Sequence, residues 1–266
     1  MTGTQTLAGV GLSNSYLTRN SLMRSLLVSL AAMAEVPAAA LAQDYDAPRN
    51  ATVNAVGATM LRVDARAGQL RITGRADLTE VRVRGTARAS TRGLLEDIKL
   101  ETERNGTEVT VRVVVPEMRD RSWDDQHALL DLVIETPAAL PLDVDDSSGD
   151  MTVESVAAKI RIEDASGNIR VRDAGGDVWI SDNSGGIEVH GVKGSVDIDE
   201  DSSGEIEIYD VTGSVHIGRD SSGSIDVSRV GGDFVVERDG SGSIDYDGVK
   251  GKVDIPTRDR YRRTRR

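Results

Sequence analysis

The sequence contains no cysteine and few aromatic residues, with two Trp, five Tyr and one Phe among 266 residues. Without cysteine the chain has no disulfide bonds, no thiolate ligand for a metal and no cysteine to carry a lipid anchor. The apolar run from Leu26 to Ala34 is also too short for a transmembrane helix, which needs roughly 20 residues. We therefore expect a mature chain that has no transmembrane segment and is stabilised by its fold alone.

Charge is unevenly distributed along the chain. The 44 acidic residues outnumber the 32 Lys and Arg, yet the last ten residues, TRDRYRRTRR, contain six Arg and one Asp. An acidic body repels nucleic acid and anionic lipid, so we expect no nucleic-acid partner. We expect residues 257–266 to form a basic, disordered tail that discourages other chains from pairing with the last strand. Contact with phosphates of the outer-membrane surface is the alternative role for this tail.

The N-terminus has the features of an export signal. Arg24 precedes the apolar run, and small residues follow at Ala40 and Ala42, the small-x-small pattern of a signal-peptidase site. We predict a signal peptide over residues 1–42, with Met23 as an alternative start. This leader predicts export to the periplasm, or to the cell surface or extracellular space, of a Gram-negative-type bacterium.

The second half of the sequence contains a tandem repeat. An Asp recurs every 18 or 19 residues, followed two positions later by Ser and three positions later by Gly. The six repeat Asp residues are Asp146, Asp164, Asp182, Asp201, Asp220 and Asp239. Between the turn signals, apolar residues alternate with polar ones, which is the pattern of half-buried strands. Each unit therefore contains two short strands and two tight turns.

Two strands in each unit predict one coil of a β-solenoid. We expect an all-β fold in which residues 146–256 form about six coils of a two-sheet parallel β-solenoid, of the β-helix or β-roll type. Each strand then pairs with its equivalent about 4.8 Å away, so that Ile187, Ile206 and Ile225 lie in one column. A β-propeller is the competing all-β fold, but six units would form only three blades, too few to close.

Residues 43–145 contain a weaker form of the same pattern. Leu70 and Ile72 alternate with polar residues after a glycine, and the following segment EVRVRG predicts a partner strand. The segment DIKLETERNGTEVTVRVVVP predicts a hairpin with Asn105 and Gly106 in a type I′ turn. We expect this β-rich part to cap the N-terminal edge of the solenoid, because an open sheet edge invites pairing with other chains.

These motifs also occur together in a known family. The chain has AGQLRITG near its start, SSGDM after Pro141, and then tandem units such as SGEIEIYDVTGSVHI. In these features it resembles the putative-adhesin β-strand-repeat family, a bacterial exported domain of unknown function, over most of residues 55–256. The resemblance implies a β-repeat fold and an adhesin-like role. It assigns no catalytic or binding residue, because the shared motifs are structural.

Stacking in register places the six repeat Asp residues in one ladder, about 4.8 Å apart. We expect each Asp to accept hydrogen bonds from the amides of its own turn, as in an Asx turn. A weak cation site along this ladder is the alternative. We expect no other metal site and no cofactor, since His127, His190 and His216 fall at unrelated positions of the pattern.

Two outward-facing features are candidate binding surfaces. An acidic column is predicted on one sheet, formed by Glu188, Glu207, Asp226 and Asp245. It is either a solvated face that blocks unwanted sheet contacts or a docking strip for a basic partner. Trp179 is predicted to point outward from the other sheet. Its ring either stacks on a sugar or is covered by the N-terminal part of the chain.

No arrangement of residues in the sequence predicts catalysis. We expect an exported, non-catalytic scaffold, adhesin-like or associated with the envelope, that binds an envelope or extracellular macromolecule as a monomer. A self-assembling structural protein of the envelope is the second possibility, which the predicted caps disfavour. A carbohydrate-active β-helix enzyme is the third, and it requires acids and bases clustered in a cleft rather than aligned on a flat face.

Overall fold

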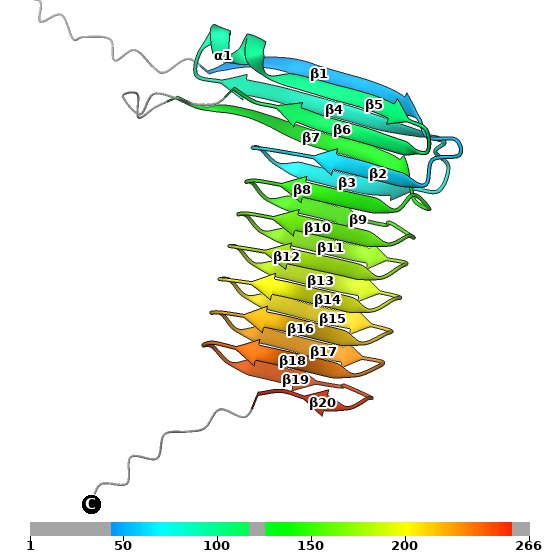
Figure 1. Ribbon diagram of the computed structural model, residues 1–266, viewed down its shortest axis with the longest axis vertical. Coiled ribbons are helices and arrows are strands. Elements are labelled where there is room, and N and C mark those ends of the chain that lie inside the picture. The colour runs from blue at the N-terminus through cyan, green and yellow to red at the C-terminus, as the bar shows by residue number, and fades with distance from the viewer. Residues whose placement is uncertain (1–43, 117–125, 257–266) are drawn as a thin grey trace, which may run out of the picture. The chain divides into compact units, whose positions relative to one another are not determined.

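Alternating apolar and polar residues form strands through most of the described chain. The computed structural model describes residues 44–116 and 126–256, which form two ten-stranded sheets, named sheet A and sheet B (Figure 1). The helix α1 (Arg92–Asp97) is six residues long. Within the described ranges, no helix has the length and apolar character needed to cross a membrane.

The order of the strands in space departs from their order in the sequence at the N-terminal end of each sheet. From that end, sheet A contains β1 (Tyr45–Asn54), β4 (Glu80–Ala89), β7 (Ala128–Pro137), β3 (Leu70–Arg75), β9 (Met151–Glu154), β11 (Ile169–Ala174), β13 (Ile187–Val192), β15 (Ile206–Val211), β17 (Ile225–Val230) and β19 (Ile244–Asp247). Sheet B contains β5 (Lys99–Asn105), β6 (Glu108–Val114), β2 (Met60–Asp64), β8 (Leu142–Asp146), β10 (Ile160–Asp164), β12 (Val178–Asp182), β14 (Val196–Asp201), β16 (Val215–Asp220), β18 (Phe234–Asp239) and β20 (Val253–Asp254).

From β8 onward the chain alternates between the two sheets, and one strand from each sheet makes one coil (Figure 1). Each strand pairs in parallel with the equivalent strand of the neighbouring coil, so that Ile187, Ile206 and Ile225 are direct partners. The prediction of an all-β, two-sheet parallel β-solenoid with about six regular coils is confirmed.

The core lies between the inward faces of the two sheets. Alternate residues of each strand point inward, and the Ile residues at the centre of these strands, such as Ile180, Ile198 and Ile208, are fully buried. Because equivalent residues lie on top of one another, their shapes match from coil to coil. Burial of each such side chain stabilises the fold by about 1.5–3 kcal/mol before conformational entropy is subtracted.

The change from 18 to 19 residues per coil occurs within sheet B. One residue separates the inward Ile180 and Asp182 in β12, whereas two residues separate Ile198 and Asp201 in β14. The pairing register shifts just after Ile180, which marks a β-bulge. An inserted residue normally turns all the following side chains to the opposite face, but a bulge restores the original direction. Asp201 therefore still points inward.

Glycine is required at the corner that leads from sheet B to sheet A. Gly204 has a φ of +148°, and a Cβ atom there would lie 1.7 Å from the carbonyl oxygen of Gly185 in the preceding coil. Equivalent glycines have the same problem throughout the stack, at Gly149, Gly167, Gly185, Gly223 and Gly242. The corner amides also join the coils, since the Gly204 N–H donates to the carbonyl of Ser222 at 3.1 Å. Only glycine combines this φ with so close a backbone approach.

Part of the N-terminal region forms a seventh coil of the same kind. β2 pairs in parallel with β8, β3 pairs in parallel with β9, and Gly68 extends the column of corner glycines with a φ of +127°. The expectation that EVRVRG pairs with the β3 segment is wrong, because β4 pairs antiparallel with β1 and β7 instead. This segment lacks the corner that carries the chain to the other sheet, so its strands reverse direction.

The predicted hairpin is present as β5 and β6, but its turn differs from the prediction. Asn105 pairs with Glu108, so the two turn residues are Gly106 and Thr107. Only Gly106 has a positive φ, of 59°, whereas a type I′ turn requires positive φ at both positions. The prediction of a type I′ turn at Asn105 and Gly106 was therefore wrong by one residue and in turn type.

Antiparallel strands and α1 close the N-terminal end of the sheets. β1 and β5 are the edge strands there, and Thr91 caps α1 by accepting a hydrogen bond from the Leu94 amide at 3.2 Å. Arg49 of β1 donates to the carbonyls of Leu95 and Ile98 at 2.8 and 3.0 Å. The guanidinium thus satisfies carbonyls at the end of α1 that lack partners within the helix.

Replacing a corner glycine tests this account of the fold. Gly204→Ala should destabilise the chain by about 2–5 kcal/mol, since it adds backbone strain and overpacking against Gly185. Urea denaturation followed by circular dichroism measures this change. Gly93→Ala in α1 is the control, because a Cβ at Gly93 meets no atom within 4 Å. Equal effects of the two substitutions would contradict the corner geometry.

Candidate functional site

Outward side chains of sheet A form straight columns across the coils. The predicted acidic column is in register, since Glu188 pairs with Glu207, Glu207 with Asp226, and Asp226 with Asp245. Asp247 of β19 adds a fifth carboxylate in the neighbouring column. We call these five residues of β13, β15, β17 and β19 the acidic face. The sign of charge changes at β11, whose outward residues are Arg170 and Arg172.

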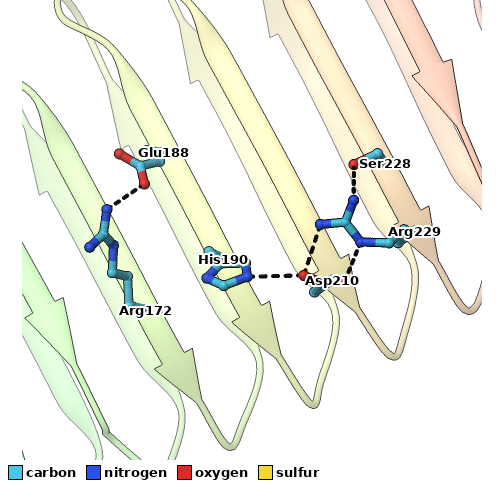
Figure 2. Close-up of polar contacts among 6 residues, drawn as sticks. All are labelled: Arg172, Glu188, His190, Asp210, Ser228 and Arg229. Atoms are coloured by element: carbon cyan, nitrogen blue, oxygen red, sulfur yellow. Dashed lines mark hydrogen bonds and ion pairs between the residues drawn. The ribbon is translucent and has the colours of Figure 1, made fainter.

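Glu188 lies at the boundary between the basic and acidic strands. Arg170 donates to one of its carboxylate oxygens at 2.5 Å and Arg172 donates to the other at 2.7 Å (Figure 2). Partial burial opposes ionisation of Glu188, but the two guanidinium groups outweigh it and lower its pKa. Glu188 is therefore an ionised carboxylate whose hydrogen-bonding capacity is largely used within the chain.

Glu207 is held by a neighbouring phenol. The Tyr209 hydroxyl donates to the Glu207 carboxylate. Desolvation and then this carboxylate raise the pKa of Tyr209, so the phenol keeps its proton. The Tyr209 ring also lies 5.7 Å from the ring of His190 on the adjacent strand β13.

A second group of contacts occupies the corner at the end of the sheet A strands. Arg229 donates to both oxygens of Asp210, at 2.5 and 2.9 Å, and His190 Nε2 lies 2.9 Å from Asp210 Oδ2 (Figure 2). The hydrogen bond from Arg229 is the main reason that the pKa of Asp210 falls to about 2. Asp210 and Arg229 have φ values of 61° and 57°, which are costly for side chains other than glycine.

The corner group was missed by the sequence analysis, although the sequence contains a signal for it. Gly191 and Gly248 occupy the equivalent corner in other coils with φ values of 74° and 65°. Two glycines at one position of a repeat indicate a left-handed backbone there. The repeat would then have placed Asp210 and Arg229 side by side on the same corner.

A shallow hollow of about 310 Å³ lies on the acidic face. It forms because Ser228 is small and stands in its column between Tyr209 and Asp247. The hollow is lined by Tyr209, Asp226, Val227, Ser228, Asp245, Tyr246 and Asp247. It therefore presents three carboxylates and an aromatic side chain to solvent. This combination suits an ammonium or guanidinium group, which carries several donors and also interacts with aromatic rings.

The described part of the chain offers no compact metal centre. Within it, no three His, Cys, Asp or Glu side chains are placed so that they hold one metal ion. The histidines are instead dispersed in separate ion pairs, with His127 near Asp44 at 3.3 Å, His190 near Asp210, and His216 near Asp197.

The six repeat Asp residues form an in-register ladder on the inside of sheet B. Five of them are at most 5% exposed, namely Asp146, Asp164, Asp182, Asp201 and Asp220. One oxygen of each of these five accepts a hydrogen bond from a serine amide of the following turn, at 2.8–3.3 Å. These are the contacts that the predicted turn role requires.

Trp179 points outward from β12 of sheet B, as predicted, but its ring has a different neighbour. The Arg161 guanidinium of the adjacent strand β10 lies over the ring, 4.4 Å from its centroid. The expectation that the N-terminal part covers Trp179 is wrong, because β10 and β14 flank β12. Arg161 also occupies a ring face that a sugar would need for stacking.

Comparison with known proteins identifies similar folds only. No protein-family model and no curated protein matches the chain. A solved structure of a "putative cell adhesion protein" from Clostridium sporogenes is 12% identical, with 80% of this chain and 99% of that chain covered and a TM-score of 0.31. A "putative lipid binding protein" from Parabacteroides distasonis is 15% identical, with 78% and 94% covered and a TM-score of 0.38.

A "putative adhesin" from Bacteroides fragilis is 13% identical, with 80% of this chain and 97% of that chain covered and a TM-score of 0.30. The descriptions of two of these three structures refer to adhesion, as does the name of the family that the sequence motifs resemble. At such identities and TM-scores, the function of this chain has to be inferred from its own residues.

The contacts of His216 provide a test of the outward columns of sheet B. Hydrogen bonds to the carboxylates of Asp197, at 2.8 Å, and Glu237, at 3.1 Å, raise the pKa of His216 above 6.5. Asp197→Asn should therefore lower this pKa, which an NMR titration of the imidazole measures. Asp226→Asn on sheet A is the control and should leave it unchanged. An unaltered pKa in Asp197→Asn would show that the two side chains do not meet.

Proposed function

We propose that the protein is an exported, non-catalytic scaffold that uses the acidic face of sheet A to bind a basic segment of an envelope or extracellular macromolecule. The single observation that carries this proposal is the in-register column of like charges over four consecutive strands, from Glu188 to Asp245. Its adhesin-like character consists in this repeated, flat, charged surface.

The solenoid fold does not require a column of like charge. On sheet B the outward residues alternate in sign, with Asp143 bound by Arg62 at 2.9 Å and by Arg161 at 3.3 Å. Further along the same column, Asp197 binds His216. Both columns are compatible with the same backbone. The like-charged column of sheet A is therefore a separate property of its residues, and it favours a surface role over a structural one.

The carboxylates of the last two strands are available to a partner. Glu188 and Glu207 are already engaged by arginines and by Tyr209. Within the described part of the chain, Asp226, Asp245 and Asp247 make neither hydrogen bonds nor ion pairs through their side chains, and all three line the hollow around Ser228. Grouped charges of one sign raise the local concentration of oppositely charged ligands and speed their association.

A binding role fits this arrangement better than catalysis or end-to-end assembly. Hydrolysis of a glycosidic bond requires two carboxyl groups on either side of a cleft, whereas the acidic face is a row on one side of a sheet. Assembly by addition of coils requires open edges, and the N-terminal edges are antiparallel strands beside α1. Export is inferred from the leader at residues 1–42, which lies outside the described residues, as does the basic segment 257–266.

Neutralising the hollow tests the proposed binding surface. The variant Asp226→Asn/Asp245→Asn/Asp247→Asn should bind a fluorescent nona-arginine peptide about tenfold more weakly, since three exposed ion pairs contribute roughly 0.5 kcal/mol each. Fluorescence anisotropy at several salt concentrations measures the affinity. Asp145→Asn/Asp199→Asn/Asp254→Asn removes three outward charges from sheet B and is the matched control. Equal losses in both variants would reduce the effect to net charge and reject a specific face.

Deletion of the basic tail separates the acidic face from the other charged candidate. The chain without residues 257–266 should still capture its partner from solubilised envelope fractions, and neutralisation of Asp226, Asp245 and Asp247 should abolish that capture. If the deletion alone abolishes capture, the tail is the binding element and the acidic face is only a solvated surface.

A further inference from the structure

The Asp ladder places carboxyl groups where a charge is poorly tolerated. Neighbouring members are direct partners in the parallel pairing of sheet B, so their backbones are about 4.8 Å apart. Asp201 has no solvent exposure and Asp182 has 1%. The β-bulge in β14 keeps Asp201 inside even though its coil is one residue longer. The inward position is thus retained across both coil lengths.

Each of the four N-terminal members has one oxygen that lacks a partner. The Oδ1 atoms of Asp146, Asp164, Asp182 and Asp201 accept hydrogen bonds from serine amides of their turns. Their Oδ2 atoms are buried and make no hydrogen bond. A buried ionised carboxylate with an unpaired oxygen is far more costly than a neutral carboxyl group in the same place.

Among the described residues, no cationic side chain compensates these four carboxyl groups. The charged groups that act on them are other carboxylates, namely Asp145 on Asp146, the flanking ladder members on Asp164, and Asp182 and Asp220 on Asp201. Desolvation is the largest effect in each case, and it raises the pKa of Asp146 to about 6 and those of Asp164 and Asp201 to about 7. Desolvation also raises the pKa of Asp182.

The other titratable groups around the ladder lie on the outward side of the same strands. These are Asp145, Glu163, Glu200 and Arg219, and Arg219 is paired with Glu200 at 3.2 Å. From sheet A, the facing residues are the corner glycines and the first inward side chains, which are Met151, Ile169, Ile187 and Ile206. Ala65 follows β2 and lies next to Asp146 in the column. The proton is therefore the simplest positive charge that the ladder can take up.

We propose that the Asp ladder retains protons in the folded chain at neutral pH, so that the solenoid is a proton-binding structure that becomes more stable as its surroundings become mildly acidic. A protonated carboxyl group resembles an asparagine amide in shape and in its single-sided donor. Stacked asparagine side chains are known to form stabilising ladders along parallel strands. Small rotations of the carboxyl groups would let each O–H donate to the next member of the column.

The direction of the pH effect follows from linkage. In the unfolded chain these Asp residues have a pKa near 3.8, so between about pH 4 and pH 7 the folded chain binds protons that the unfolded chain does not. The stabilisation is complete below the unfolded pKa and is lost as pH rises through 6 and 7. Each retained proton changes the unfolding equilibrium constant by about tenfold per pH unit within this window.

Urea denaturation of residues 43–266 between about pH 5 and pH 8, at constant ionic strength, tests the proposal. The urea midpoint of the wild-type chain should fall as pH rises. Asp164→Asn/Asp182→Asn/Asp201→Asn should remove most of this dependence and raise the midpoint at the alkaline end, because an amide needs no proton. Wild-type stability that is constant or rises with pH would overturn the proposal, as would an unchanged dependence in the variant.

Two controls separate the ladder from other titrating groups. His216 also has a raised pKa and contributes in the same direction, so all measurements are repeated in a His216→Gln background. The outward variant Asp226→Asn/Asp245→Asn/Asp247→Asn should keep the wild-type pH dependence. Asp210 has the opposite sign, since the stability that its lowered pKa provides is lost only at more acidic pH than this window.

A spectroscopic measurement keeps the proposal testable if the ladder variant does not fold. Infrared or ¹³C NMR spectra of the wild-type chain with labelled Asp carboxyl carbons should show protonated carboxyl signals near neutral pH, which disappear in urea. Fully ionised signals in the folded chain would reject protonation. If the alkaline-pH stability instead depends on whether Na⁺, K⁺, Ca²⁺ or a bulky organic cation is present, the ladder binds metal cations and the proposal is wrong.

Discussion

The close backbone approach at the glycine corner is the constraint on which the rest of the structure depends. There the amide of Gly204 donates to Ser222 of the next coil, while the Gly204 Cα approaches the carbonyl of Gly185 too closely for any side chain. This contact fixes the direction of the chain as it passes from sheet B to sheet A. It therefore also fixes which residue of each coil lies above which, along the whole stack (Figure 1).

Such regular stacking has opposite consequences for apolar and for charged residues. An apolar column, such as Ile187, Ile206 and Ile225, gains matched shapes without further adjustment. A charged column instead brings like charges to within about 5 Å of one another, which costs about 1 kcal/mol in water and far more when buried. The chain shows three arrangements: alternating signs on sheet B, solvent-exposed like charges on sheet A, and buried carboxyl groups along the ladder. Only the last two leave a charge requirement that another species can meet.

The regular coils could be predicted from the sequence because one pattern of turn residues and alternation determines them repeatedly. The outward direction of Glu188 and Trp179 followed from that alternation as well. The N-terminal strands could not be predicted, since β4 and β7 are long alternating strands whose partners depend on tertiary contacts rather than on a local signal. The ladder was predicted to cap turns, but its burial depends on the bulge in β14, which a count of residues alone does not place. Arg161 above Trp179 required knowledge of which strands are neighbours.

The position of the acidic hollow within the stack links binding to local stability. In a stack of coils each unit contacts only its neighbours, so a terminal coil is held from one side. The last coil ends in β20, which has two residues, and Tyr246 of β19 is 49% exposed although it occupies an inward column. The hollow spans β15, β17 and β19. A basic segment bound across these strands would bridge the weakest coils to the better packed ones, so part of its binding free energy would appear as added stability of the C-terminal end.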